Sequence, residues 1–401
     1  MEVNWKQNLW IAWIGTFFTG ASFSLVMPFM PIYIEKLGVP KNKVELYSGL
    51  AISISALASG LVAPIWGRLA DQKGRKLMMI RASFVMTFTM GGLAFVPNVT
   101  WLLILRLLNG LFAGYIPNAT ALIASQTPKE RSGYALGTLS TGLVGGTLLG
   151  PLLGGVLAQA FGIENVFLIT GFMLLLVLLL TIFKVREDFE PIKRSELQST
   201  KAIFQQIKYK NILFSLFITS LIIQVAVQSI APILTLYIRE LSGNPANILF
   251  VSGLIVSLVG VSAMISSPFL GRLGDKYGNH RLLVVGLIFC LLVFLPMAFV
   301  KTPFQLGFLR FLLGFGTGAL MPSVNAILTK IVPESGISRI FSYNQMFTNF
   351  GQVMGPLVGS IVSGYFGYAS VFIVTSIILL FNVILITINF GKRLKQREII
   401  N

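Results

Sequence analysis

The composition of this 401-residue chain excludes a soluble globular protein. Hydrophobic residues make up 55% of the chain and charged residues only 11%, a balance typical of proteins embedded in lipid. The net charge of +17 does not indicate nucleic-acid binding, because the basic residues lie in short groups between apolar runs, as topology signals do.

Twelve apolar runs follow one another along the chain, separated by short polar or Gly/Pro-bearing stretches. A helix crosses a bilayer with about 20 apolar residues, so each run is long enough for one span. The predicted spans are 9–34, 46–66, 77–96, 101–122, 134–160, 164–184, 211–238, 248–270, 282–300, 304–328, 342–366 and 369–390. The predicted fold class is therefore an all-α integral membrane protein with twelve transmembrane helices.

The basic residues predict how the chain is oriented and divided. Most Lys and Arg residues fall in alternate loops, in residues 185–210 and in the C-terminal tail. Because basic residues favour the cytoplasmic side, we expect a multi-pass protein of the plasma membrane with both termini in the cytoplasm. The parts are an N-terminal six-helix half (1–184), a cytoplasmic linker (185–210) and a C-terminal six-helix half (211–401).

An internal repeat supports this division, because similar residues recur about 204 positions apart. The matches are Pro28 with Pro232, residues 67–74 with 271–278, and Arg106, Gly110 and Gly114 with Arg310, Gly314 and Gly318. The pair Gly150-Pro151 returns one residue out of register as Gly355-Pro356. Since each half starts and ends on the same side, we predict parallel repeats around an axis along the membrane normal.

A sequence rich in glycine and charge follows the second predicted span. Its members are Gly67, Arg68, Asp71, Gly74, Arg75 and Lys76, and a second copy keeps Gly271, Asp275 and Gly278. Gly67 allows two helix ends to approach closely and Gly74 allows a tight turn, while the Asp71 carboxylate can face a helix N-terminus or an arginine. The alternative is a solvated turn whose charges only set the topology.

Arg106 lies inside the fourth predicted span, together with Asn109, Gly110 and Gly114. A charge at membrane depth costs at least about 2.5 kcal/mol, so we expect Arg106 to face the protein interior or a watery cavity. There it either binds backbone carbonyls as a structural residue or takes part in proton coupling.

Glycines form a stripe on the fifth predicted span. Its members are Gly137, Gly146, Gly150, Gly154 and Gly155, with Pro151 between them. Glycines four residues apart give a helix a flat face against which another helix packs closely, and a proline adds a kink.

These motifs resemble those of the major facilitator superfamily, and within it the twelve-helix drug/proton antiporters of the Gram-positive multidrug efflux type. The resemblance covers essentially the whole chain and implies two pseudo-symmetric six-helix halves that move around one central site. It also implies that residues 67–76 latch the cytoplasmic faces together, and that Arg106 belongs to an Arg-x-x-Gln-Gly element in which Asn replaces Gln. We expect a carrier that uses a proton gradient and no cofactor, and that acts as a monomer.

The resemblance places the substrate site in a cavity lined chiefly by the first, fourth, fifth, seventh, eighth, tenth and eleventh helices. Buried polar groups need partners and adaptable apolar side chains suit lipophilic ligands. The candidate cavity residues of this kind are Phe23, Met27, Tyr115, Asn118, Gln224, Gln228, Asn344, Gln345 and Asn349. The alternative for each is packing inside the protein or contact with lipid.

The acidic residues depart from the usual antiporter pattern, in which a carboxylate inside the helices carries the proton or binds a cationic drug. All fourteen Asp and Glu residues lie in predicted loops or near predicted helix ends. An arginine stays protonated in proteins, so Arg106 cannot carry the proton itself. We expect Glu35 or Glu45 to do so if either side chain reaches the cavity.

The sequence therefore predicts a secondary active exporter that removes amphipathic or lipophilic compounds in exchange for protons. The alternative is a proton-coupled exporter or flippase of one metabolite, sugar or lipid. We do not expect an enzyme, because Arg106 and Arg310 are the only clear charges at membrane depth. With one cysteine, Cys290, and one histidine, His280, the chain offers neither an internal disulfide nor a metal-binding cluster.

Overall fold

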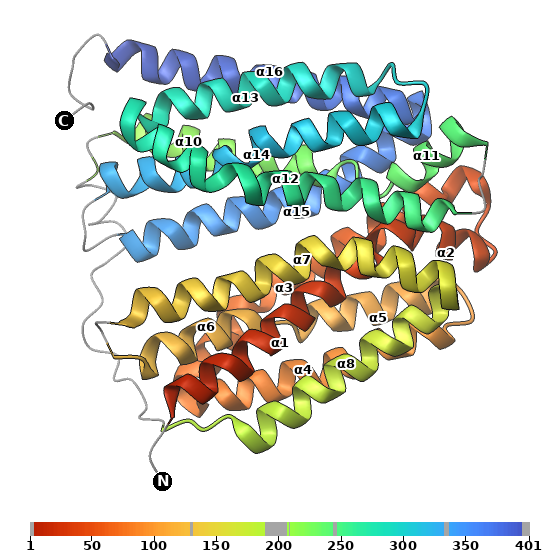
Figure 1. The fold of residues 1–401 in the computed structure, drawn as a ribbon, viewed down its shortest axis with the longest axis vertical. Coiled ribbons are helices and arrows are strands. Elements are labelled where there is room, and N and C mark those ends of the chain that lie inside the picture. The colour runs from red at the N-terminus through yellow and green to blue at the C-terminus, as the bar shows by residue number, and fades with distance from the viewer. Residues whose placement is uncertain are drawn as a thin grey trace. The chain divides into compact units, whose positions relative to one another are not determined.

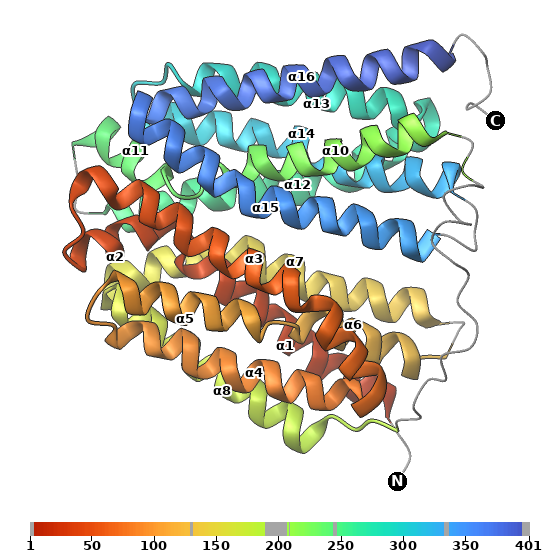
Figure 2. The same ribbon diagram turned by 180° about the vertical axis from the view of Figure 1, so that it is seen from behind.

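The computed structural model describes residues 4–128, 131–188, 207, 209–243, 247–332 and 337–394 (Figures 1 and 2). Every regular element within these ranges is a helix, as the sequence predicted. The chain divides into two compact units, which are described one at a time.

The first unit begins with a broken helix, α1 (Trp5–Val26), the 3-10 turn η1 (Met27–Phe29) and α2 (Met30–Lys36). The elements that follow are α3 (Lys41–Lys73), α4 (Arg75–Gly92), η2 (Leu93–Phe95), α5 (Val99–Leu111), α6 (Tyr115–Gln126), α7 (Ser132–Phe161) and α8 (Ile163–Lys184). The first turns of α12, up to Ser257, also belong to this unit. Within it, α1 packs most extensively against α7, and α4 against α8.

The second unit repeats this arrangement. Its elements are α10 (Lys210–Gln228), α11 (Leu234–Ser242), the remainder of α12 (Ile248–Tyr277), α13 (Asn279–Met297), α14 (Pro303–Ile331), α15 (Ile337–Phe366) and α16 (Tyr368–Leu394). Here α10 packs most extensively against α15, which is the pairing that the repeat predicts from α1 and α7. Most of the predicted linker, 185–210, lies outside the described residues.

Lipid offers no hydrogen-bond partners to a polypeptide backbone, so a spanning segment must satisfy its N–H and C=O groups internally as a helix. Among the described residues, 11 helices are long and apolar enough to cross a membrane. The remaining predicted span corresponds to α15, which has 30 residues but carries amide side chains that lower its hydropathy.

Three predicted spans are interrupted rather than continuous. The first breaks at η1, which contains Pro28, and the seventh breaks between α10 and α11, just before Leu234 and beside Pro232. A proline lacks the N–H that would continue the helical ladder. The fourth span breaks between α5 and α6 at Gly114, whose φ of +136° suits glycine and few other residues.

Two side chains bind the carbonyl groups that the break at Gly114 leaves without helical partners. The Trp66 indole donates to the Leu111 carbonyl at 2.7 Å, and the Arg81 guanidinium donates to the Ala113 carbonyl at 3.0 Å. The guanidinium also stacks over the Trp66 ring, 3.5 Å from its centroid. A cation at a helix C-terminus is electrostatically favourable, so Arg81 stabilises the broken span.

The Gly- and charge-rich sequence at 67–76 was predicted to form a loop, but nearly all of it is helical. Residues up to Lys73 form the last turns of α3, and Arg75 already begins α4. The second copy behaves alike, because α12 continues to Tyr277 and α13 starts at Asn279. A prediction from hydropathy ends a span where charged residues begin. The helix itself can continue, because it needs no apolar side chains once it leaves the lipid.

Candidate functional site

The turn between α3 and α4 has the geometry that its glycine predicted. Gly74 has a φ of +94° and its repeat counterpart Gly278 a φ of +97°, values that favour glycine. A Cβ added at Gly67 or Gly271 would meet no described atom within 4 Å, so these glycines show no close helix approach in this structure. The side chains of Arg68, Asp71 and Asp275 lie outside the described residues, and the latch role remains a prediction.

Glu187 binds the start of α4, a contact that the sequence did not suggest. Its carboxylate accepts the backbone N–H of Arg75 at 2.8 Å and that of Lys76 at 2.7 Å. These are two of the N–H groups that a helix N-terminus leaves without partners, and negative charge is favoured there. The first residues of the linker are thereby fixed to the end of the candidate latch.

The neighbouring residue, Arg186, is held through its backbone. The Asn8 side chain accepts the N–H of Arg186 at 3.1 Å and donates to its carbonyl at 2.6 Å. Gln126, the last residue of α6, donates to the same carbonyl at 3.1 Å, and Asn8 also donates to Gln126. With Val185 fully buried, the chain after α8 is attached to the ends of α1, α4 and α6.

Replacing Glu187 by alanine should lower the stability of the first unit by about 1 kcal/mol, because two N–H groups lose a charged cap. The measurement is the thermal midpoint of the purified protein in detergent. Asp188→Ala is the matched control, since the Asp188 side chain is exposed on the same segment. Equal midpoints for the two variants would show that the cap contributes nothing.

Arg106 lies on α5 and is buried, with only 3% of its surface exposed. Ser55 of α3 donates to its backbone carbonyl at 2.6 Å. Its Nε and Nη2 atoms have no hydrogen-bond partner among the described residues, and the same holds for Nε of the repeat counterpart Arg310. A buried charge with unused donors is costly, which favours a functional explanation over a purely structural one.

The two acidic candidates for proton transfer lie on α2 and α3 of the first unit. Glu35 is half-buried on α2 and Glu45 is buried on α3. Glu45 precedes Ser55 by ten residues on the same helix, which is about 15 Å along its axis. Because Ser55 binds the Arg106 carbonyl, the two residues lie at the same height along their helices. Coupling between Glu45 and Arg106 therefore requires water between them or a movement of the helices.

The glycine stripe of α7 packs directly against the backbone of α1. A Cβ at Gly146 would clash with the Phe17 carbonyl, and one at Gly154 would clash with the Leu25 carbonyl. Gly150 lies against the Ser24 hydroxyl, which donates to the Gly146 carbonyl at 3.2 Å. The predicted close crossing is therefore present, and its partner is the first helix.

The second unit contains the same crossing, which the sequence analysis recognised only at Gly355-Pro356. In α15, a Cβ at Gly351 would clash with the Leu221 carbonyl of α10 and one at Gly359 with the Ser229 carbonyl. Leu221 and Ser229 follow Phe17 and Leu25 by about 204 positions. The two helix pairs thus repeat the close approach to a backbone carbonyl at both positions.

Two members of the predicted stripe behave differently from the others. Gly155 faces the start of α12, where a Cβ would meet the Leu249 carbonyl and the Cα of Gly253. Gly137 is exposed and a Cβ there would meet no described atom within 4 Å. The close crossing therefore excludes Gly137, although the sequence pattern included it.

Alanine at Gly146 or Gly351 should destabilise the protein by about 1–3 kcal/mol, because the added methyl group has no room against a backbone carbonyl. We expect a lower thermal midpoint and slower transport for both variants. Gly137→Ala is the matched control and should behave like the parent. A Gly146→Ala variant as stable and active as Gly137→Ala would contradict the close crossing.

Two of the candidate cavity residues are used for packing. Tyr115 is 1% exposed in the apolar core of the first unit, its ring lies against Gly15, and its hydroxyl pairs with Thr181 at 3.2 Å. Asn344 of α15 is buried and accepts a hydrogen bond from Ser220 of α10 at 2.8 Å. Both side chains have their partners within their own unit.

The other candidates keep part of their surface or hydrogen-bonding capacity available. Phe23, Met27, Gln224 and Gln228 are half-buried. Gln345 is exposed and donates to Asn349, one turn later on α15, at 2.9 Å. Asn118 is buried and donates to the Gly114 carbonyl at the break in the fourth span. These side chains remain candidates for substrate contact.

Aromatic side chains form a row along α1, which the sequence predicted only in part. The Trp13 and Phe17 rings stack 5.7 Å apart, and Phe17 meets Phe18 edge to face. The Trp13 indole donates to Thr141 of α7 at 3.0 Å. The spacing of aromatic residues on the first predicted span was the signal for this row. Only the contact with α7 distinguishes Trp13 from an aromatic residue placed at the membrane–water interface.

Comparison with known proteins identifies the same family that these motifs resemble. The Major Facilitator Superfamily model matches residues 12–304 and again residues 216–399. The chain is 63% identical to "Multi-drug resistance efflux pump PmrA homolog" of Lactococcus lactis, over 99% of this chain and 98% of that protein. It is 50% identical to "Multidrug resistance protein MdtG" of Klebsiella pneumoniae, over 97% and 95%.

A solved structure confirms the fold at much lower sequence identity. The crystal structure of a bacterial homolog of the human lysosomal transporter Spinster aligns with a TM-score of 0.81 and 14% identity, covering 98% of both chains. The curated relatives come from both Gram-positive and Gram-negative bacteria, so the resemblance is broader than the Gram-positive type alone. The chain belongs to the major facilitator superfamily and is a membrane transporter rather than an enzyme.

Proposed function

We propose that this transporter exports several amphipathic or lipophilic compounds from the cytoplasm in exchange for protons. The observation that carries the proposal is the 63% identity, over nearly the whole chain, to a protein named as a multidrug efflux pump. The half-buried aromatic side chains of α1 and the amides of α10 and α15 support it. Each set offers adaptable contacts within its own unit, which suits substrates of varied shape.

Purified protein in liposomes that contain a pH-sensitive dye tests this proposal. A panel of lipophilic dyes, antibiotics, sugars and lipids is added, and proton movement is recorded for each compound. Several unrelated lipophilic compounds should drive proton flux. A response to a single sugar or lipid would replace the proposal with a specific exporter or flippase.

Proton coupling is proposed to depend on Arg106. Nε and Nη2 of its buried guanidinium have no hydrogen-bond partner among the described residues, and such a group can stabilise a carboxylate that releases a proton during the cycle. Glu35 and Glu45 are the candidate proton carriers, and helix movement or water would have to connect them with Arg106. In this scheme both termini lie in the cytoplasm and one monomer completes the cycle.

Arg106→Ala should abolish accumulation of a transported dye against its gradient in inverted vesicles, and Arg106→Lys should restore it only partly, because lysine lacks the planar donor fork. Accumulation is measured with and without an imposed pH gradient, alongside dye binding. Arg310→Ala removes the equivalent buried arginine from the second unit and shows whether the loss is specific to Arg106. Parent-level accumulation by Arg106→Ala would leave this arginine a structural residue.

A further inference from the structure

The end of α13, the start of α14 and the loop between them enclose an apolar groove in the second unit. Its volume is about 580 Å³, within the range of about 300–1,000 Å³ that is common for ligand sites. Gln305, in the first turn of α14, is the single polar residue of its lining. The groove can therefore hold a hydrocarbon chain with little cost in buried polar groups.

Phenylalanine rings form the walls of the groove and are exposed. Phe299 in the loop, and Phe304 and Phe308 on α14, have 69%, 84% and 56% of their surface exposed. Phe304 and Phe308 are four residues apart and so lie on one face of the helix. A contiguous exposed apolar surface marks a place where another molecule binds, and the molecules that surround a membrane-embedded chain are lipids.

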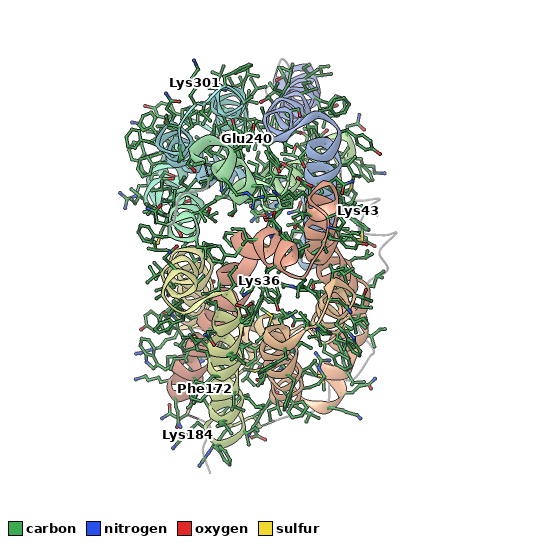
Figure 3. All side chains as sticks on the ribbon, turned by 90° about the vertical axis from the view of Figure 1, so that its right-hand side faces the viewer. Lys36, Lys43, Phe172, Lys184, Glu240 and Lys301 are labelled. Atoms are coloured by element: carbon green, nitrogen blue, oxygen red, sulfur yellow. The ribbon has the colours of Figure 1, made fainter. Side chains whose placement is uncertain are left out.

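A cationic residue lies at the loop end of the groove. Lys301 follows the lining residue Val300 and is exposed, and Figure 3 shows it at the edge of the second unit. Its backbone N–H donates to the side-chain oxygen of Gln305 at 2.8 Å, and the Thr302 hydroxyl accepts the N–H of Gln305 at 3.3 Å. These two bonds fix the loop, so the backbone of Lys301 is held beside the polar residue of the groove.

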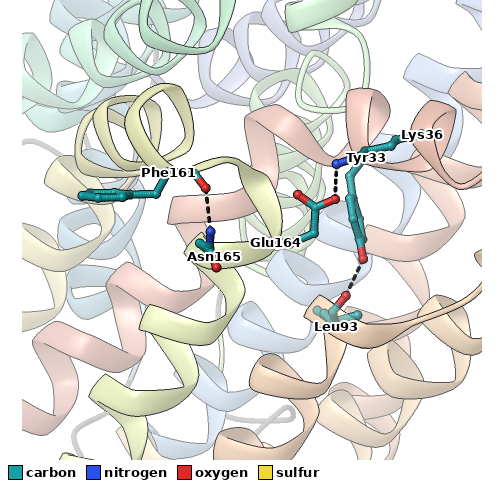
Figure 4. Close-up of polar contacts among 6 residues, drawn as sticks. All are labelled: Tyr33, Lys36, Leu93, Phe161, Glu164 and Asn165. Atoms are coloured by element: carbon teal, nitrogen blue, oxygen red, sulfur yellow. Dashed lines mark hydrogen bonds and ion pairs between the residues drawn. The ribbon is translucent and has the colours of Figure 1, made fainter.

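The ammonium group of Lys301 is available to a ligand. Another lysine at the end of a helix, Lys36, pairs with Glu164 (Figure 4), whereas Lys301 makes no ion pair with a described residue. An exposed cation at a membrane surface attracts anionic lipid headgroups. Together with the apolar groove, it is complementary to an amphiphile that has a negative head and a hydrocarbon tail.

The repeat shows that the turn itself does not require a lysine. In the corresponding loop of the first unit, Asn98 caps α5 by accepting the N–H of Trp101 at 3.2 Å, as Thr302 caps α14. The residue 204 positions before Lys301 is Pro97, which has neither a charge nor an N–H. Both units have the cap but only one has the cation, so the fold does not explain Lys301.

We propose that the groove at the α13–α14 loop binds an anionic phospholipid, whose phosphate contacts Lys301 and whose acyl chain lies against Phe299, Phe304 and Phe308. The charge selects this occupant over an uncharged or cationic lipophile, because neither gains from contact with an ammonium group. In the orientation proposed above, the site faces the outer leaflet. Lipid binding here does not depend on which compound is transported.

Native mass spectrometry of the whole protein in detergent tests the site. Phosphatidylglycerol, which is anionic, and phosphatidylcholine, which is zwitterionic, are added separately, and the dissociation constant of the first bound lipid is measured for each variant. Lys301→Gln removes the charge, Lys301→Arg keeps it, and Phe308→Ala removes part of the wall. Two controls, Lys43→Gln and Phe172→Ala, change exposed residues that do not line the groove (Figure 3).

The parent should bind phosphatidylglycerol more tightly than phosphatidylcholine. Lys301→Gln should weaken phosphatidylglycerol binding roughly fivefold, as expected for one basic residue at an anionic surface, and leave phosphatidylcholine binding unchanged. Lys301→Arg should retain the preference. Phe308→Ala should weaken binding of both lipids by a similar factor, roughly two- to tenfold, because the tail contact does not depend on the headgroup. Neither control should change either constant.

Parent-like binding of phosphatidylglycerol by Lys301→Gln, or an equal loss in Lys43→Gln, would overturn the selection by charge. Unchanged constants for Phe308→Ala would show that no acyl chain occupies the groove. A dimer that Phe308→Ala dissociates would assign the groove to a second copy of this chain and would equally overturn the proposal. The four substituted positions are exposed, so the variants should fold, and their thermal midpoints verify this.

Discussion

Close contact between helix backbones at glycine is the constraint on which the rest of this structure depends. Inside a bilayer, apolar side chains gain little by turning from lipid to protein, so helices associate mainly through tight packing and hydrogen bonds. The crossings at Gly146 and Gly154 in the first unit, and at Gly351 and Gly359 in the second, supply that packing. Each crossing fixes the first helix of its half against the fifth, and the aromatic row of α1 and the amides of α10 take their positions from it.

Much of the fold follows from the sequence because the bilayer leaves few choices. A chain that must satisfy its backbone in lipid forms helices of the length that the membrane requires, so counting apolar runs finds the elements. The repeat spacing then indicates which helices correspond. Hydropathy fails where a helix leaves the lipid, as at the end of α3, and where amides lower its mean, as in α15.

The site was less predictable, since side-chain direction depends on neighbours that a single sequence does not reveal. Tyr115 and Asn344 look like cavity residues by type and position, yet each is satisfied inside its own unit by Thr181 or Ser220. Gly137 belongs to the predicted glycine set, yet a Cβ there would meet no described atom within 4 Å. Glu187 lies in a charged segment that predicted only a linker, and its contact with α4 joins residues more than a hundred positions apart.

The attachment of residues 185–187 also bears on how the protein is made. The hydrogen-bond partners described above for this segment, in α1, α4 and α6, precede it in the chain. During synthesis the amino-terminal part of a protein generally folds first, and here the Glu187 carboxylate becomes available as soon as α8 is complete. The first six spans can therefore cap the start of α4 before the ribosome reaches α10, so a nascent half-transporter need not wait in the membrane with an open helix terminus.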